Sequence, residues 1–258
     1  MASGMVVVIS APRSGSNALE NRLAQLPGFF PMGEMFNHHF MGQPGVTEVA
    51  GFSMAARNQA PVRFFDHLRT QRRGTGVLRY FADHEAQILP HLLADSSAKK
   101  IILRRNPLYR YISHCAARES QQWRVTRKKD RHLVQVRFDC AEFLRELALH
   151  RAFAQGVTQE LDRLGQSYFA LRYTDLARPA RLKALTKWLG FAQAPDLPAA
   201  QIYRQNPQPL RRRVLNYEDM VAELAEMGLD HLAQPEGQTQ KNRRMAGSGK
   251  SFLQQPKA

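Results

Sequence analysis

The sequence predicts an α/β protein, a three-layer sandwich with helices on both faces of a mostly parallel central sheet. Two observations favour this class. Short apolar segments rich in β-branched residues alternate along the chain with longer amphipathic segments, and the first apolar segment leads through a small-residue loop into a helix. The 258-residue length suits one domain, and the sequence shows neither an internal repeat nor an interdomain linker, so residues 1–258 are expected to form a single domain.

The first half of the chain is expected to contribute three strands. Residues 5–10 read as a short buried strand, and residues 11–17 form a turn before an amphipathic helix with Leu19, Leu23 and Leu26 on one face, ending at Gly28. Residues 30–60 are rich in glycine and proline, so they are expected to be mostly loop. Residues 76–81 and 100–104 are the next expected strands, separated by a helix over 84–93.

The second half is expected to be mainly helical. Asn106 and Pro107 mark a helix start, because asparagine is a favoured N-cap and proline a favoured first helical residue. Further helices are expected at 140–164, at 179–189 with Gly190 after its end, and at 215–227, and a fourth strand at 168–173. From residue 234 the chain is polar and glycine-rich, which predicts a basic, mobile tail over 234–258.

The composition favours a polyanionic partner. The chain has 37 Lys and Arg against 22 Asp and Glu, a net charge of +15, and residues 99–133 alone hold 11 basic residues and two acidic ones. Such a concentration suits a nucleic acid, a phosphorylated cofactor, or an anionic lipid or glycan. No apolar run reaches the length of a membrane span or a signal peptide. Cys115 and Cys140 are too few for a disulfide framework or a zinc knuckle, so a reducing cytoplasm is expected.

The loop after the first strand is the first candidate site. It lies where an open α/β sheet binds its ligand, and the N-terminus of the following helix favours an anion. Gly15 permits close approach of the backbone, Ser14, Ser16 and Asn17 add donors, and Arg13 adds a charge. The spacing alone also fits an ordinary turn with Ser16 as N-cap. No lysine follows Gly15, so the loop is not a Walker A motif and a P-loop-like kinase is disfavoured.

Four segments in order resemble the sulfotransferases that use 3′-phosphoadenosine 5′-phosphosulfate (PAPS). Residues 12–17, Pro-Arg-Ser-Gly-Ser-Asn, resemble their 5′-phosphosulfate loop. Residues 103–114 resemble their 3′-phosphate motif, with Arg-Asn-Pro and a serine eight positions after the arginine. Residues 173–176 and 185–191 resemble a later strand and helix, and residues 205–218 resemble the C-terminal block of bacterial nodulation- and lipopolysaccharide-type carbohydrate sulfotransferases. The resemblance covers roughly residues 5–220.

This resemblance implies a PAPS-dependent sulfotransferase of the EC 2.8.2 type, with PAP as the desulfonated product and no metal. It implies a P-loop-like strand, loop and helix that bind the phosphosulfate, and an acceptor hydroxyl on a carbohydrate or glycolipid. Tyr173 would stack on the adenine, although a core tyrosine fits that position equally. The cofactor-binding residues that the resemblance implies are Arg13, Ser14, Gly15, Ser16, Asn17, Arg105, Ser113 and Tyr173.

The same resemblance implies a carboxylate base, with Arg13 stabilising the leaving phosphate. Glu34 follows Gly33 at the position of a Gly-Glu pair in the bacterial carbohydrate enzymes. Because a glutamate pKa of ~4.3 is low for a base, burial is expected to raise the pKa of Glu34. His38 and His39 are the rivals, because cytosolic animal members use a histidine.

Several points stay open at this stage. Asn17 and Thr174 depart from the family's usual residues, and the Arg-Lys-Gly phosphate clamp of animal members has only a poor counterpart, at residues 241–247. A basic nucleic-acid-binding protein is the alternative function, disfavoured because residues 99–133 offer few aromatic side chains for base stacking. Residues 124–131 are available to dock on an anionic membrane surface if the acceptor is a lipid. The tail at 241–250 is hypothesised to close over bound PAPS.

Overall fold

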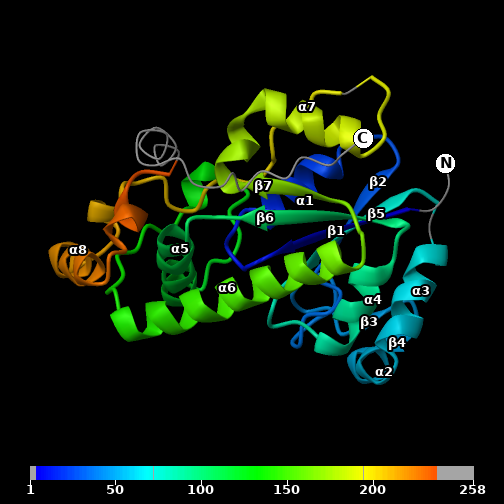
Figure 1. Ribbon diagram of the computed structural model, residues 1–258, viewed down its shortest axis with the longest axis horizontal. Coiled ribbons are helices and arrows are strands. Elements are labelled where there is room, and N and C mark those ends of the chain that lie inside the picture. The colour runs from blue at the N-terminus through cyan, green and yellow to red at the C-terminus, as the bar shows by residue number, and fades with distance from the viewer. Residues whose placement is uncertain (1–3, 72, 194, 237–258) are drawn as a thin grey trace.

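A five-stranded parallel sheet forms the centre of the protein. The computed structural model describes residues 4–236 except 72 and 194 (Figure 1). The strand order is β2-β5-β1-β6-β7, and every neighbouring pair is parallel. The strands are β1 (Gly4–Ser10), β2 (Phe29–Gly33), β5 (Thr75–Tyr80), β6 (Ala98–Arg104) and β7 (Tyr168–Arg172). The predicted three-layer α/β class with a mostly parallel sheet is therefore confirmed.

Strand β1 lies at the centre because both of its faces are apolar, as parallel sheets covered on both sides require. Val7 and Ile9 face a core that α6 covers through Val157, whereas Val6 and Val8 face a core that α1 covers. Helix α6 lies below the sheet in Figure 1, with α1 and α7 above it. The carboxyl ends of all five strands consequently share one edge of the sheet.

Eight α-helices surround this sheet in the part of the chain that the structure describes. Their bounds are α1 (Ser16–Leu23), α2 (Met54–Gln59), α3 (Pro61–Gln71), α4 (Leu89–Ala94), α5 (Pro107–Ser120), α6 (Cys140–Arg163), α7 (Pro179–Trp188) and α8 (Tyr217–Glu226). The predicted start of α5 is confirmed, since the Asn106 side chain accepts from the amides of Leu108 and Tyr109 at 3.0 and 3.4 Å. Gly190 follows α7 with a φ of 105°, as predicted for a helix end.

Three boundary predictions need correction. Helix α1 ends at Leu23, not at Gly28, because Leu26 stays buried in the following turn and extends the apolar pattern past the helix. The helix expected at 84–93 is a 3₁₀ turn (Ala86–Ile88) followed by α4. The last helix covers only Tyr217–Glu226.

The segment 30–60, expected to be mostly loop, is more structured than predicted. It contains most of β2, a two-stranded hairpin of β3 (Glu48–Val49) and β4 (Phe52–Ser53), and α2. Its glycines mark tight turns between these elements. Gly33, for example, has a φ of 70°, and a Cβ there would lie 1.9 Å from the Gly42 carbonyl oxygen.

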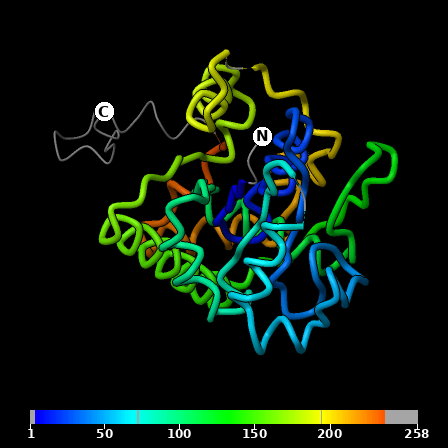
Figure 2. Tube along the Cα trace, turned by 90° about the vertical axis from the view of Figure 1, so that its right-hand side faces the viewer, coloured from blue at the N-terminus to red at the C-terminus, as the bar shows by residue number. Residues whose placement is uncertain are grey.

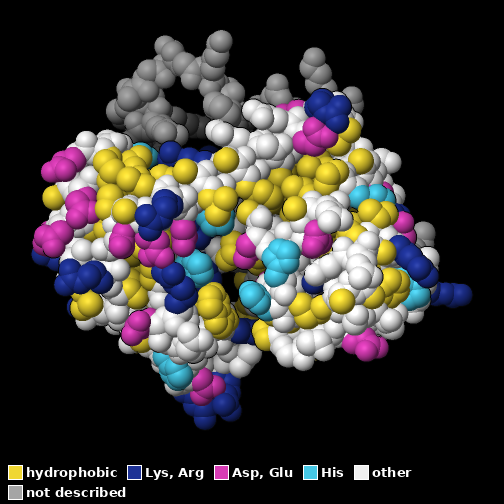
Figure 3. Space-filling model, turned by 90° about the horizontal axis from the view of Figure 1, so that it is seen from below, with side chains coloured by type: hydrophobic (Ala, Val, Ile, Leu, Met, Phe, Trp, Pro, Cys, Tyr) yellow, Lys and Arg dark blue, Asp and Glu magenta, His cyan; other side chains and the backbone are white. Residues whose placement is uncertain are grey.

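The basic segment 99–133 does not form one continuous surface. Lys100 and Arg110 are buried, at 0 % and 2 % exposed. Residues near 121–133 extend from the body as an arm, green in Figure 2, with Trp123 exposed. Basic and acidic side chains are interspersed on the face shown in Figure 3. The segment 99–133 therefore offers fewer exposed cations than its sequence alone suggests.

None of the helices in the described ranges is long and apolar enough to cross a membrane. The tail hypothesis for residues 241–250, and the segment 241–247, lie outside the described residues. Of the tail predicted at 234–258, only residues 234–236 are described.

Candidate functional site

The loop between β1 and α1 is built for an anion. Gly15 is the N-cap of α1 with a φ of 91°, and a Cβ there would lie 2.7 Å from the Tyr173 ring. Arg13 also has a positive φ, 67°. The first amides of a helix have no partner within the helix, and they carry its positive dipole end. The loop therefore presents donors at the carboxyl edge of the sheet.

Arg13 joins the loop to three distant segments. Its Nε donates to the Ser113 hydroxyl at 3.2 Å, its Nη1 to the Trp123 carbonyl at 2.7 Å, and its Nη2 to the Gln205 side chain. Burial, followed by the charge of Arg105, lowers the pKa of Arg13 to about 10. The guanidinium is thus still charged at neutral pH, and it lies where α5, the arm and the C-terminal segment meet.

Arg105 already holds an anion. Its Nε and Nη2 donate to the two carboxylate oxygens of Glu236 at 2.8 and 2.9 Å, and its Nη1 donates to the Arg13 carbonyl at 2.9 Å. The side chains of Arg105 and Glu236 are only 6 % and 7 % exposed. A two-pronged guanidinium contact of this kind suits phosphate as well as carboxylate. The Tyr173 ring completes the site, with its centre 4.1 Å from the Arg105 guanidinium carbon.

Glu34 lies just after β2 at the same edge of the sheet. Its Oε1 accepts from Arg79 at 2.8 Å and its Oε2 from the Asn37 amide at 2.9 Å. Arg79 also pairs with the buried Glu20 at 2.8 Å, so one guanidinium lies between two carboxylates. Glu34 therefore belongs to a fixed charge cluster and not to a solvated loop.

His84 completes this cluster. It is 2 % exposed, and its Nε2 lies 3.5 Å from Glu34 Oε2. Its Nδ1 accepts from the Phe81 amide at 3.3 Å, which assigns the ring proton to Nε2, facing Glu34. Burial raises the pKa of Glu34, but the His84 hydrogen bond and the Arg79 charge outweigh burial, so the pKa lies below its ordinary value. The expected net rise in the pKa of Glu34 is therefore wrong, although burial does act in that direction.

The structure brings most of the predicted cofactor residues together. Arg13, Gly15, Arg105, Ser113 and Tyr173 form one connected group. The Ser113 hydroxyl contacts Arg13, whereas the resemblance pairs this serine with Arg105. The Tyr173 ring packs against Gly15 and Arg105.

The remaining predicted residues lie around this group. Ser14 and Ser16 are buried in the loop, at 1 % and 3 % exposed, and Asn17 is half-buried. Glu34 follows the end of β2, which lies two strands from β1 in the sheet. At the ~4.8 Å spacing of neighbouring strands, Glu34 is therefore ~10 Å along the sheet edge from the end of β1. His38 and His39 are exposed.

Sequence reasoning missed several members of the site. Gln205 belongs to the block at 205–218 that carries the resemblance, and that block was the only available signal for it. Glu236, Arg79 and His84 had no signal, because their partners are 131, 45 and 50 residues away in the sequence.

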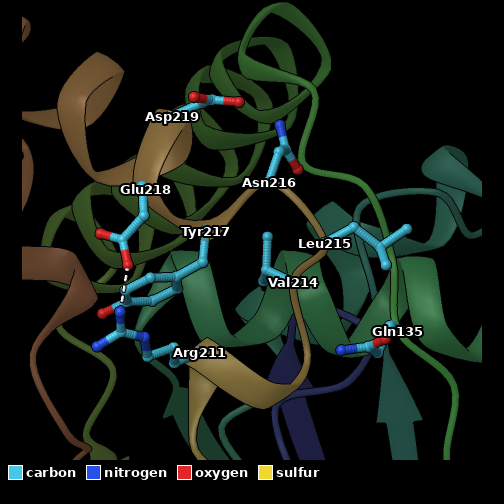
Figure 4. Close-up of a pocket in the computed structure, with 8 residues that line it drawn as sticks. All are labelled: Gln135, Arg211, Val214, Leu215, Asn216, Tyr217, Glu218 and Asp219. Carbon is cyan, nitrogen blue, oxygen red and sulfur yellow. Dashed lines mark ion pairs between the residues drawn. The ribbon is translucent and has the colours of Figure 1, made fainter.

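The block at 205–218 divides in the structure. Gln205 reaches Arg13, whereas the end of the block lines an open hollow beside α8 (Figure 4). In this hollow Arg211 pairs with Glu218 at 2.7 Å, and both side chains are largely exposed. Exposed pairs of this kind contribute little stability. Among the described residues no group of three or more His, Cys, Asp or Glu side chains could hold a metal ion.

Two solved structures are similar to the chain. One is a sulfotransferase from Alicyclobacillus acidocaldarius, 19% identical, with a TM-score of 0.46, covering 90% of this chain and 96% of that one. The other is a sulfotransferase domain from the curacin biosynthetic pathway, 14% identical, with a TM-score of 0.42, covering 85% of this chain and 89% of that one. No protein-family model matches the chain, and no curated protein matches it in sequence. At this distance neither structure bears on the activity.

Proposed function

We propose that the chain is a PAPS-dependent sulfotransferase that moves a sulfuryl group to an acceptor hydroxyl. The observation that carries the proposal is a pair of contacting arginines, Arg13 before α1 and Arg105 before α5. Arg105 already holds a buried carboxylate, that of Glu236. The acceptor class, a carbohydrate or glycolipid, is taken from the sequence resemblance.

The residues present fit such a cofactor. PAPS carries about four negative charges, and a site with two arginines and a helix N-terminus suits it. Arg13 and the first amides of α1 would hold the 5′-phosphosulfate, and Arg105 would hold the 3′-phosphate in place of the Glu236 carboxylate. When bound, PAPS supplies the sulfuryl group. Arg13 stabilises negative charge on the departing phosphate.

Glu34 is the proposed base. A carboxylate offers about four acceptor positions. Contacts from Arg79, Asn37 and His84 occupy three of these positions on Glu34, and the fourth can accept a hydrogen bond from the substrate hydroxyl. Because its pKa is lowered, Glu34 is ionised at neutral pH and ready to take the hydroxyl proton. These contacts also fix its direction, which compensates for modest basicity.

Thermal unfolding with PAP tests the proposal. A ligand at 100 times its Kd stabilises by ~2.7 kcal/mol. For a chain of this size that raises Tm by ~5–10 °C. AMP lacks the 3′-phosphate, so it should raise Tm less. Equal shifts from PAP and AMP would show that Arg105 holds no 3′-phosphate, and no shift from either would remove the proposed function.

A further inference from the structure

A cavity of about 330 Å³ lies on the α6 side of the sheet, at the carboxyl ends of β1 and β6. Ile9 and Ile102 line it from the sheet, and Leu147, Phe153 and Val157 line it from α6. Ser10, the last residue of β1, and Ser14 of the proposed phosphosulfate loop also line it. The cavity is therefore mostly apolar and directly borders the proposed reaction site.

The polar lining of this cavity is positively charged. Of the described residues that line it, none is acidic and four are arginines: Arg104, Arg105, Arg110 and Arg151. Arg110 is only 2 % exposed, and its Nη2 pairs with Glu146 of α6. Its Nε and Nη1 are buried and have no hydrogen-bond partner among the described residues, and the same holds for the Ser10 hydroxyl. A buried polar group without a hydrogen-bond partner destabilises the fold, so a ligand that supplies acceptors would stabilise this lining.

His150 adds a neutral polar group to the same lining. Its Nδ1 is also buried, and no residue in the described part of the chain is its hydrogen-bond partner. Burial, then the charge of Arg110, lowers the pKa of His150 to about 4. At neutral pH it therefore offers an uncharged ring, and the positive charge in this part of the cavity comes from the arginines.

We propose that this cavity binds the acceptor, and that the acceptor is an alcohol or phenol with an apolar body and an anionic group, which pairs with Arg110. This inference rests on the proposed function. The cavity volume is at the lower end of the range for small-molecule sites, whose volumes begin at about 300 Å³. A free sugar would leave hydroxyls unpaired against Leu147, Phe153 and Val157, so these walls favour an amphiphilic acceptor.

Glu34 is not among the described residues that line the cavity; a row of aromatic rings runs from the cavity wall to its partner His84. The Phe153 ring centre lies 6.3 Å from that of Tyr80, and the Tyr80 ring lies 5.4 Å from that of His84, the partner of Glu34. An acceptor anchored at Arg110 would direct its hydroxyl toward the loop end of the cavity. In the transfer, the acceptor oxygen would bond to sulfur and the bond from sulfur to the 5′-phosphate oxygen would break. The acceptor proton would pass to the Glu34 carboxylate, so the hydroxyl end of the acceptor must extend past the cavity wall to reach it.

Calorimetric titration without cofactor tests the cavity. The probes are 4-hydroxyphenylacetate and 6-hydroxyhexanoate, each compared with its uncharged diol analogue, tyrosol and 1,6-hexanediol. We expect at least one acid to bind the parent chain at least tenfold more tightly than its analogue. Arg110→Gln should abolish that preference, and Ala154→Trp should fill the cavity and abolish binding without touching the ion pair. Arg145→Gln, on an exposed position of the same helix, is the control and should bind like the parent.

Three results would overturn the inference: no acid binds the parent, acids and analogues bind equally, or both cavity variants bind like the parent. Melting temperatures show which variants are folded. A PAP titration on the same preparations separates the two proposals. If PAP binds and the acids do not, the cavity proposal falls and the proposed function stands. If the acids bind and PAP does not, the proposed function falls, and the acceptor role of the cavity falls with it.

Discussion

Glu34 depends on side chains from another segment for its direction and charge. Arg79 comes from β5 and His84 from the turn after it, and both reach across to the residue after β2. The proton on His84 Nε2 favours the ionised carboxylate, because a donor stabilises the charged form. We therefore propose His84 as a positioning residue and Glu34 as the group that meets the acceptor.

Replacing Glu34 tests its role directly. Glu34→Gln keeps the shape and removes the basicity, so kcat should fall ~10²–10⁴-fold while PAP affinity is retained. His38→Ala and His39→Ala should lower kcat by less than Glu34→Gln does, because both histidine side chains are exposed. Steady-state kinetics with PAP titrations measure both quantities. Loss of transfer in a histidine variant, with Glu34→Gln active, would assign the base to that histidine.

The pH dependence of kcat tests His84. Because the pKa of Glu34 is lowered, kcat should stay level as pH falls from 8 until the carboxylate protonates, below the ordinary value of ~4.3. His84→Leu removes a donor to the charged form, so the pKa of Glu34 should rise and the acid limb of the profile should move to higher pH. A lower kcat with an unmoved acid limb would leave His84 with a packing role only.

At the scale of elements, α6 carries two groups whose pKa values make stability depend on pH. His150 has a pKa of about 4 in the fold and 6.5 as the ordinary value, and Glu146 has a pKa of about 2 and 4.5 as the ordinary value. Burial lowers the pKa of His150. Burial raises the pKa of Glu146, but the hydrogen bonds from His114 and Arg110 lower it by more. In both cases the unfolded chain binds the proton more tightly, so stability is lost as pH falls.

The loss of stability through His150 falls in the pH range between its unfolded pKa, near 6.5, and its pKa in the fold, about 4. Between pH 7 and pH 5 the unfolding free energy should fall by about 2 kcal/mol through this residue alone. Urea unfolding of the parent and of His150→Gln at both pH values measures the difference. The variant should lose about that much less than the parent on acidification. Equal losses in the two proteins would mean that His150 is not a buried neutral residue.

The C-terminal segment enters the candidate site through Glu236. Its carboxylate takes the position on Arg105 that we assign to a phosphate, so it should compete with the cofactor. Glu236→Gln should tighten PAP binding about 3–10-fold, because a neutral amide pairs less strongly with a guanidinium. Glu226→Gln, at an exposed position of α8, is the matched control. Weaker PAP binding in Glu236→Gln would mean that Glu236 supports the site and does not compete for it.

At the scale of the whole molecule, the sheet was largely predictable. The three inner strands, β5, β1 and β6, are mostly buried and read as apolar runs, as parallel strands do, and the edge strand β7 also reads as a short apolar run. The edge strand β2 was missed because Pro31 and Gly33 interrupt it, and an edge tolerates such residues. Helix α3 was also missed, within a segment where no element had been assigned.

The candidate site was predictable in part. The loop with Arg13, and Arg105 before α5, come from local patterns of strand, loop and helix. The partners that set their geometry and charge come from far along the chain, such as Gln205, 192 residues from Arg13. Long-range pairs of this kind leave no local pattern, so the lowered pKa of Glu34 and the Arg105–Glu236 pair became visible only in the fold.

The central claim is that Arg105 binds the 3′-phosphate of a nucleotide cofactor. Calorimetric titration of PAP into the parent chain, Arg105→Ala and Arg145→Ala tests it most directly, because Arg145 is an exposed arginine on α6 and is not among the residues that line the cavity. The Arg105→Ala variant should lose ~1.5–3 kcal/mol of binding free energy, the scale of a charged hydrogen bond, and Arg145→Ala should bind like the parent. Equal PAP affinity in the parent and Arg105→Ala, or no PAP binding by the parent, would contradict the claim.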